Sequence, residues 1–484
     1  MAEINEAQIE EIVAQVIRNL QNDGQHLPTT TPQPAVPSAS DTGIFPTVDQ
    51  AIAAAKAAQV EFVKLGFAKR REIIEAIRQT SLEHSRVLAE LAVEDTQMGI
   101  VEHKVMKNDG GANLSPGVED LSSEATTGDT GLLLVEYLPF GVINSITPTT
   151  NPTSTVINHA IIMLSAGNSV VFSPHPNAQR CTQETMKVIN AAVIKAGGPP
   201  NMLTAVAEAT LRRAKEIMDH ADIAMVVATG GGSVVRAALT SGKKAIAAGP
   251  GNPPAIIDET ADLAKAAKDV IIGNSFDNNL LCIGEKALFV VDSVADEVIR
   301  ELQNSGGYLT NPREQQAVEN VVIQDGDPNI DYIGKDANVI LDAAGIRATT
   351  GTVSVVVEVP ADHTFVIDEY LMPVLPVVRV RDFDEALKGA LAADGGRGHT
   401  AMLHTNNSAR ITQFTQAMNC NVTVVNAPSY ACAGIDGEGF LAMTIAGPTG
   451  EGFTRPRTFT RQQRLTVAGE LSAHQILSSG SPVL

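Results

Sequence analysis

A regular alternation of short β-branched segments with longer helical segments constrains the fold of this chain more than any other feature. From about Leu132 the apolar segments GVINSIT, NSVVFS, MLTAV and DIAMVVATGGG follow one another, and each gap between them is long enough for a helix. Strands that alternate with helices form βαβ units and a parallel sheet with helices on its faces. A second alternating block runs from about Pro254 to Pro428. The sequence therefore predicts an α/β fold with two α/β domains and a cleft between them.

The first 42 residues are a separate segment. Over residues 1–20 apolar side chains recur at helical spacing, which predicts an amphipathic helix with one apolar stripe: Ile9, Ile12, Val13, Val16, Ile17 and Leu20. Residues 21–42 are rich in Pro, Ser and Thr, which predicts a disordered linker. A short helix on such a linker is unstable alone, so we expect it to dock. Two kinds of docking are open: packing on this protein or a sister subunit, or binding in a groove of another protein as an address tag.

Composition excludes several classes of function. The 484 residues carry 35 Lys and Arg against 55 Asp and Glu, a formal net charge of −20, with no basic cluster. Nucleic acid is therefore not an expected partner, because binding to its backbone depends on clustered cations. No apolar run approaches the ~18 residues of a membrane span, so we expect no membrane segment. The four cysteines have no CxxC or CxxH spacing, so the sequence predicts no metal site and no disulfide framework, and it favours a reducing cytoplasm.

One of the four cysteines has a distinctive setting. Cys282 lies in SFDNNLLCIGEK, between a polar turn and a strand, where a thiol could project into a cleft and act as a thiolate nucleophile. Cys181, Cys420 and Cys432 lie in a helical pattern or beside a strand, where buried structural thiols are usual.

Polar residues follow the strands of the first block. In parallel sheets ligands bind beyond the carboxyl ends of the strands, where Thr147, Ser173 and Thr229 lie. The turn TGGG that starts at Thr229 could approach a phosphate or nicotinamide, or it could simply be a tight turn. Asn151, beside Pro152 at a predicted helix start, could donate to an oxyanion or cap the helix.

Two further segments could belong to a site. Glu369 in DEYLMP could bind sugar hydroxyls or be a solvated carboxylate. The loop AAGPGNPP, around residues 249–254, contains no ionisable side chain and could be a rigid hinge between the two domains.

Together and in this order, TPTTNP, SPHP, TGGG, AGPGNPP, the Cys282 segment and E-x-x-x-P resemble the aldehyde dehydrogenase superfamily from about residue 43 to the C-terminus. The phrases EYLPFGVINSITPTTNPT, GNPPAIIDETADL, NSFDNNLLC and NAPSYA are similar to the CoA-acylating propionaldehyde dehydrogenase type found in bacterial microcompartments. The resemblance implies a Rossmann-like cofactor domain over residues 43–250, a catalytic domain over 251–433, and a return to the cofactor domain with an oligomerisation tail over 434–484. It also implies that residues 121–140 contribute to oligomerisation.

The resemblance assigns roles by position. Cys282 matches the nucleophile, and Asn151 matches the side chain that holds the oxyanion together with the Cys282 N–H. Glu369 matches a ligand of the nicotinamide ribose, with Leu371 packed near that ribose. The other cofactor-binding positions that it implies are Thr147, Pro148, Thr149, Ser173, Thr229, Gly230 and Gly231. Ser173 replaces a lysine of hydrolytic members, which favours NAD over NADP.

A departure from the family pattern indicates the acyl acceptor. Acid-forming members carry a water-activating glutamate in the AAGPGNPP loop, and the matching position here is Ala247. Without that base, attack of water on a thioester should be slow, whereas a thiol needs less help, so coenzyme A is the expected acceptor. Propanal is the first expected substrate and ethanal the second. The alternatives are an acetaldehyde-specific acylating enzyme, an acid-forming enzyme with another base, and a catalytically silent scaffold.

The resemblance also implies an address and an assembly. Similar enzymes carry an N-terminal helix and linker that direct them into a microcompartment, so residues 1–20 are expected to bind a shell protein or a co-encapsulated enzyme in the cytoplasm. A homo-oligomer is expected, with contacts near Gly131–Tyr137 and in the tail RTFTRQQRLTV. The sequence assigns no role to His399 or to the arginines of TRPRTFTR.

Overall fold

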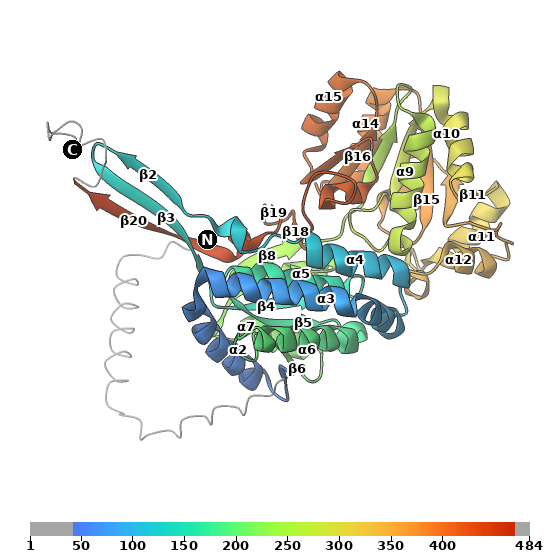
Figure 1. Ribbon diagram of the computed structural model, residues 1–484. Coiled ribbons are helices and arrows are strands. Elements are labelled where there is room, and N and C mark those ends of the chain that lie inside the picture. Colours follow the sequence, from blue (N-terminus) through green and yellow to red (C-terminus); the bar gives the residue numbers. More distant parts are fainter. Residues whose placement is uncertain (1–41, 470–484) are drawn as a thin grey trace, which may run out of the picture. The chain divides into compact units, whose positions relative to one another are not determined.

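The computed structural model describes residues 42–469, and these belong to one compact unit (Figure 1). The helix predicted over residues 1–20 and nearly all of the linker predicted over 21–42 lie outside this range. Within residues 42–469, no helix is long and apolar enough to span a membrane.

The first large sheet has six strands, which all pair in parallel. In spatial order they are β1 (Ile44–Phe45), β6 (Leu203–Val206), β5 (Ser169–Pro174), β4 (Val142–Thr147), β7 (Ile223–Thr229) and β8 (Lys244–Ala248). Alternate residues of each strand enter two different cores, because successive side chains of a strand point to opposite faces. In β5, for example, Val170 and Phe172 pack in one core and Val171 packs in the other.

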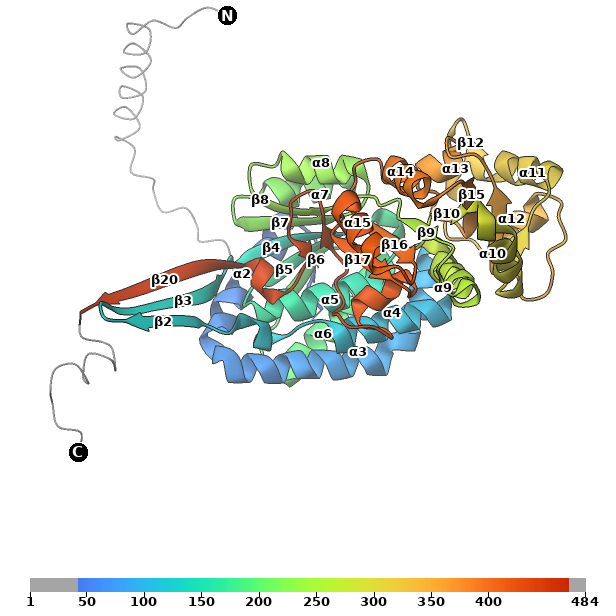
Figure 2. The ribbon, with the colours of Figure 1, turned by 90° about the horizontal axis from the view of Figure 1, so that it is seen from above.

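Helices cover both faces of this sheet (Figure 2). On one face lie α3 (Gly66–Thr96), α5 (Pro152–Ser165) and α6 (Gln179–Lys195), and α4 (Val101–Leu114) packs on α3 and α5. On the other face lie α2 (Val48–Phe62), α7 (Leu211–Asp219) and α8 (Gly232–Leu239). Helix α5 is buried along its whole length, which explains its nearly continuous apolar sequence VINHAIIML.

The second large sheet has seven parallel strands. In spatial order they are β11 (Gly307–Leu309), β14 (Ser354–Glu358), β15 (Val374–Val380), β10 (Ala287–Val291), β9 (Pro254–Ile257), β16 (Thr400–His404) and β17 (Val422–Val425). One face is covered by α9 (Leu263–Ser275) and α10 (Asp292–Asn304). The other is covered by α11 (Pro312–Val322), α12 (Ala337–Ala343), α13 (Thr364–Ile367), α14 (Phe383–Asp394) and α15 (Ser408–Met418).

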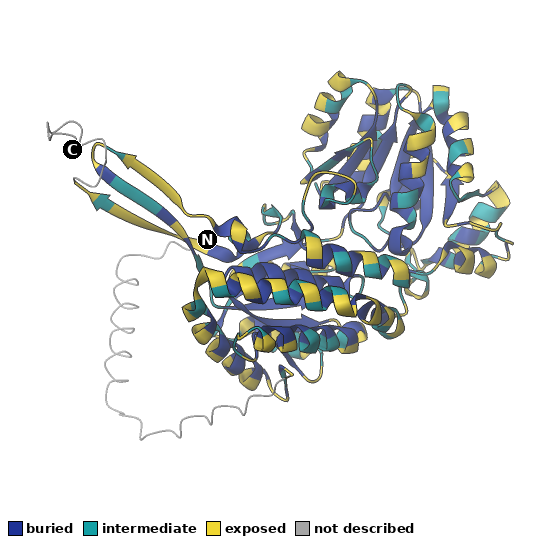
Figure 3. Ribbon diagram, viewed as in Figure 1, coloured by how far each residue is buried: buried dark blue, intermediate teal, exposed yellow. Residues whose placement is uncertain are grey.

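A third, antiparallel sheet joins distant parts of the chain. Its strands are β2 (Glu124–Gly128), β3 (Gly131–Pro139) and β20 (Thr460–Ala468), with β3 in the centre. It extends away from the first large sheet, and most residues of its two outer strands are exposed (Figure 3). Two of the unassigned arginines anchor its base: Arg455 pairs with Asp120, and Arg457 lies 3.3 Å from Glu124 and over the ring of Tyr137.

Short elements complete the fold. Two small antiparallel pairs are β12 (Ile323–Gln324) with β13 (Asp327–Pro328), and β18 (Ile445–Ala446) with β19 (Gly452–Phe453). Two 3-10 turns matter for the site, η5 (Phe276–Asn279) and η7 (Ser429–Ala433).

The α/β class predicted from the alternation is confirmed, and each alternating block forms one parallel sheet. The loop at residues 249–253 connects β8 of the first sheet to β9 of the second, as the hinge interpretation requires. The domain limits at residues 250 and 433 stay a prediction, because the described residues group as one unit.

Candidate active site

The predicted site residues line one cavity of about 860 Å³. It opens beyond the carboxyl ends of β4, β5, β7 and β8, the position at which parallel sheets bind ligands. Its far side is formed by the segment that follows η5 and by residues from 430 to 443. All of the predicted site residues line it: Thr147, Pro148, Thr149, Asn151, Ser173, Thr229, Gly230, Gly231, Cys282, Glu369 and Leu371.

Cys282 is held by an unusual backbone turn just before it. Asp277, Asn278 and Asn279 have φ angles of 50°, 55° and 66°, in the left-handed region that Asp and Asn tolerate better than most residues. The Asn279 amide donates to the carbonyls of Asn274, at 2.8 Å, and Glu285, at 3.1 Å. Consecutive left-handed residues are strained, and such strain is typical of functional sites.

Gly251 fits behind this cysteine only because it lacks a side chain. A Cβ at this position would lie 2.7 Å from the Cys282 carbonyl oxygen and 3.0 Å from Cγ of His399. The glycine therefore allows the hinge loop, the cysteine segment and His399 to approach one another.

Asn151 immediately precedes α5 but does not cap it. Its Oδ1 accepts a hydrogen bond from Nζ of Lys107 at 2.6 Å, and its Nδ2 donates to Oγ1 of Thr150 at 3.0 Å. The helix-cap interpretation is therefore wrong, and the amide is available to a ligand in the cavity.

Glu369 and Lys286 form a buried ion pair near Cys282. Their side chains are 11% and 3% exposed, and Lys286 Nζ lies 3.6 Å from Glu369 Oε1. Lys286 also donates to the carbonyl and the side-chain oxygen of Asn279, at 2.7 and 2.6 Å. The interpretation of Glu369 as a solvated carboxylate is therefore wrong. Its burial raises its pKa, against the attraction of Lys286.

The environment of Cys282 favours the neutral thiol. Burial raises the pKa of Cys282 to about 12, the charge of Glu369 acts in the same direction, and Lys286 and Lys107 oppose it. The sequence pattern predicts a thiolate nucleophile, and in this environment the thiolate is a minor species at pH 7.

The strand ends on the opposite side of the cavity offer polar groups. Ser173 Oγ accepts from Nδ2 of Asn144 at 2.9 Å, and Oγ1 of Thr147 is buried without a hydrogen-bond partner among residues 42–469. A Cβ at Gly230 or Gly231 would meet no described atom within 4 Å. The protein's own packing therefore does not require glycine in this turn, and the space is available to a ligand.

The hinge loop contributes no carboxylate to the cavity. Ala248 at the end of β8 lines the cavity, whereas Ala247, the position matched to the water-activating glutamate, is buried and is not part of the lining, and that match stays a prediction. Of the residues that line the cavity, only Asp219 and Glu369 are carboxylates.

Three buried groups at the cavity were not predicted from the sequence, and one of them, Lys107, lines the cavity. His399 is 3% exposed, its Nδ1 lies 2.8 Å from Oγ1 of Thr400, and its Nε2 has no partner within the described part of the chain. Burial and the charge of Lys286 lower the pKa of His399 to about 4, so the ring is neutral at pH 7. Lys107 and Asp277 are the other two. No motif marks these positions, and only the buried setting shows them.

The fold and the cavity define a two-sheet α/β protein with a cysteine and an amide donor at the carboxyl ends of the strands of the first sheet. Residues 39–436 match the model of the aldehyde dehydrogenase family, and the chain belongs to that family.

Two relatives are similar to this chain over nearly their whole length. The chain is 42% identical over 468 residues to the acetylating acetaldehyde dehydrogenase EutE of Escherichia coli, covering 95% of this chain and 98% of the relative. It is 43% identical over 444 residues to a CoA-propanoylating propanal dehydrogenase of Salmonella typhimurium, covering 92% and 96%.

Two solved structures are similar over most of their length. One is a propionaldehyde dehydrogenase from the fucose utilisation microcompartment of Clostridium phytofermentans, with a TM-score of 0.87, 43% identity, and coverage of 88% of this chain and 98% of that chain. The other is a Rhodopseudomonas palustris propionaldehyde dehydrogenase with bound propionyl-CoA, with a TM-score of 0.88, 40% identity, and coverage of 92% and 99%.

Proposed function

We propose that this protein is a CoA-acylating aldehyde dehydrogenase. It converts a short aldehyde, coenzyme A and NAD to acyl-CoA and NADH through a thioester on Cys282. The observation that carries this proposal is a cavity that holds Cys282 and Asn151 while the hinge loop beside it supplies no carboxylate to activate water. The acylating relatives support the same reaction.

The cavity fits a nicotinamide cofactor. Thr147 Oγ1 and Glu369 Oε1 are buried without hydrogen-bond partners among the described residues, so each can bond a ligand group. The open space at Gly230 and Gly231 precedes α8, whose N-terminal N–H groups favour a phosphate. When bound, NAD supplies the hydride acceptor. These residues would hold it along the strand ends, with Glu369 and Leu371 at the nicotinamide ribose.

Acylation uses the two groups at the cysteine end. The sulfur of Cys282 bonds to the aldehyde carbon as the thiol releases its proton to solvent, and the carbonyl oxygen becomes an oxyanion. Asn151 Nδ2 and the Cys282 N–H donate to that oxygen. Loss of hydride from the same carbon to a bound nicotinamide cofactor would leave that carbon as a thioester of Cys282.

Deacylation needs an acceptor that is reactive without a carboxylate base. The thiol of coenzyme A has a pKa nearer neutrality than that of water, so its thiolate forms at useful concentration. It attacks the thioester carbon, the bond to Cys282 breaks, and acyl-CoA leaves. Since one thioester replaces another, the step is close to thermoneutral and the reaction is reversible.

Propanal is the proposed substrate and ethanal the second candidate. Both assignments derive from the relatives, which include acetylating and propanoylating enzymes. The two aldehydes differ by one methylene, worth only ~1–3 kcal/mol of discrimination.

The decisive assay is NADH formation with ethanal, propanal and butanal, with and without coenzyme A. We expect steady turnover only with coenzyme A and the highest kcat/KM for propanal. Turnover that continues without coenzyme A would show an acid-forming enzyme. The Cys282→Ala variant is the control, and activity that survives this change would refute the nucleophile. No activity of the parent protein under any of these conditions would favour a scaffold.

We also propose that residues 1–20 are an address tag that binds a shell protein or a co-encapsulated enzyme of a cytoplasmic microcompartment. The microcompartment origin of a similar structure supports this proposal. Deletion of residues 1–20 should leave specific activity unchanged and abolish co-purification with shells. A deletion variant that still enters shells would contradict the tag.

A homo-oligomer built through the third sheet completes the proposal. Strand β20 exposes most of its residues, including Leu465 at 51%. A Leu465→Lys variant should shift the protein to smaller species in light scattering, and an unchanged mass would count against this contact.

A further inference from the structure

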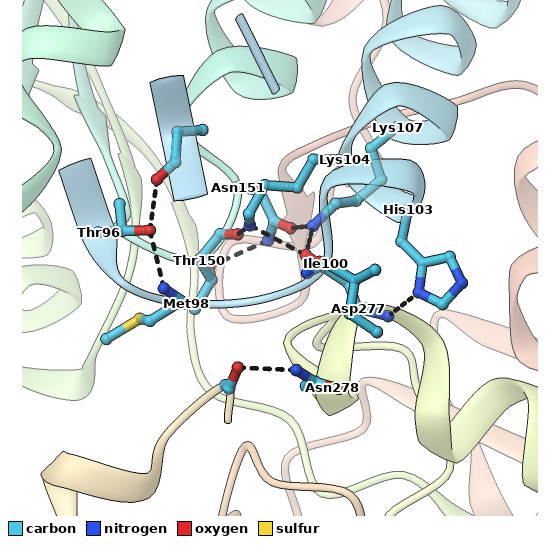
Figure 4. Close-up of polar contacts among 12 residues, drawn as sticks. Thr96, Met98, Ile100, His103, Lys104, Lys107, Thr150, Asn151, Asp277 and Asn278 are labelled. Carbon is cyan, nitrogen blue, oxygen red and sulfur yellow. Dashed lines mark hydrogen bonds and ion pairs between the residues drawn. The ribbon is translucent and has the colours of Figure 1, made fainter. Parts of the chain in front are cut away.

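Three charged side chains are buried together behind Asn151. Lys104 and Lys107 lie on α4, and Asp277 lies in η5, close to Cys282 in the sequence (Figure 4). Their side chains are between 0% and 5% exposed. Charged groups are rarely buried this completely, because the loss of hydration costs several kcal/mol per ion. A cluster this costly to bury, beside the candidate active site, therefore needs a functional explanation.

Both lysines bind the same carboxylate, but they contact different parts of the Thr150–Asn151 segment. Lys107 pairs with Asp277 and donates to Oδ1 of Asn151 at 2.6 Å. Lys104 lies 3.1 Å from Oδ2 of Asp277 and donates to the backbone carbonyl of Thr150 at 3.1 Å. Only Lys107 therefore contacts the Asn151 side chain.

Asp277 is itself fixed from several sides. Its Oδ1 accepts from the N–H of Ile100 at 2.7 Å, and its own N–H donates to Nδ1 of His103 at 2.8 Å. A Cβ at Gly99 would lie 2.3 Å from Oδ1, so glycine is needed beside the carboxylate. The carboxylate therefore holds the Lys107 ammonium in one place.

This contact determines which way the Asn151 amide faces. A lysine ammonium has three donors and no acceptor, so it can bind only the oxygen of the amide. The nitrogen must then lie on the other side, where one N–H donates to Thr150 and the second has no partner among residues 42–469. An amide turned by 180° would present its oxygen to the oxyanion and would repel it.

We propose that Lys107 is a positioning residue that, held by Asp277, fixes the Asn151 amide so that its nitrogen faces the oxyanion. This inference rests on the proposed function, because it assumes the oxyanion role of Asn151. Burial lowers the pKa of Lys107 to about 7, whereas the charge of Asp277 favours its protonated form.

The test is a double-mutant cycle between Lys107→Met and Asn151→Ala. The quantity measured is the rate of the first NADH per subunit from propanal and NAD, before coenzyme A is added, because it isolates formation of the acyl-enzyme. We expect Asn151→Ala to slow this rate by about 10²–10³-fold, as removal of an oxyanion donor does elsewhere. Lys107→Met should slow it by about 10- to 100-fold, and the double variant should be within about threefold of Asn151→Ala alone.

Two further variants separate positioning from a merely structural role. Lys107→Gln keeps a donor for Asn151 Oδ1 without the charge and should recover most of the rate that Lys107→Met loses. Lys104→Met removes the neighbouring cation from the same carboxylate and should slow the rate less than Lys107→Met at a similar loss of thermal stability.

The outcomes distinguish the inference from the function on which it rests. If Asn151→Ala does not slow acyl-enzyme formation, the proposed oxyanion role is wrong. The second outcome is that Asn151→Ala slows acyl-enzyme formation and the double variant is slowed by the product of the two single effects. Lys107 then does not act through Asn151, and the inference is overturned. A Lys107→Met rate equal to that of the parent protein would also overturn it.

Discussion

The reactivity of Cys282 towards an alkylating reagent follows from its burial. A pKa of about 12, against an ordinary value of 9.0, leaves about one-thousandth of the thiolate that an ordinary thiol has at pH 7. A thiolate of higher pKa is also the better nucleophile, with a Brønsted coefficient of about 0.4–0.5, which recovers a factor of about 15–30. We therefore expect iodoacetamide to modify Cys282 of the unliganded protein about 30- to 60-fold more slowly than a free cysteine at pH 7.

The assay is mass spectrometry of the peptide that contains Cys282, because Cys181, Cys420 and Cys432 are also present. The rate should rise about tenfold per pH unit between pH 7 and 10 without levelling off, since the titration midpoint lies above this range.

Two substitutions test the cause. Glu369→Gln removes the negative charge that raises the thiol pKa and should speed alkylation by about three- to tenfold, whereas Lys286→Met removes an opposing cation and should slow it by a similar factor. A rate that levels off near pH 8 and matches free cysteine would refute the reasoning. Both substitutions changing the rate in the same direction would refute the assignment of the two charges.

The remaining predictions concern packing and acid stability. Gly251→Ala should lower kcat by about 100-fold, because its Cβ would lie 2.7 Å from the Cys282 carbonyl oxygen and displace the nucleophile. Gly128→Ala is the matched control, because its Cβ would meet nothing within 4 Å. Equal kcat values for the two variants would contradict the prediction. His159 is buried between Oγ of Ser145 and Oγ1 of Thr444, at 2.8 Å from each, and its burial lowers its pKa to about 3. Between pH 6.5 and 3 the unfolded chain therefore binds a proton that the folded protein does not, so stability falls as the pH falls. We expect the free energy of unfolding, measured in urea, to fall by about 2–3 kcal/mol less in His159→Gln than in the parent protein between pH 6.5 and 4.5. An equal fall in the two proteins would contradict this prediction.

The fold and the lining of the cavity could be predicted from the sequence because both depend on local patterns. Strands that alternate with helices define parallel sheets, and the residues that follow such strands meet at one edge. Thr147, Ser173 and Thr229 are examples, since each ends or nearly ends a strand and lines the cavity. Cys282 and Glu369 were found from short motifs that a family resemblance placed in order.

The supporting groups could not be predicted, because their setting is created by tertiary contacts. A lysine such as Lys107 on a helix rich in polar residues is normally solvated, and nothing in the sequence links it to Asp277, 170 positions further along the chain. The thiol pKa of Cys282 depends on burial in the same way.

The third sheet sets an order for the synthesis of the protein. Strand β3 pairs along its whole length with β20, which comes almost at the end of the described chain. During translation, residues 131–139 leave the ribosome long before residues 460–468, so one edge of β3 stays unpaired while the rest of the chain is made. An open strand edge can pair with another chain. The assembly proposed through this sheet would therefore have to wait for nearly complete chains, and a ribosome that stops early leaves a product with a permanently open edge.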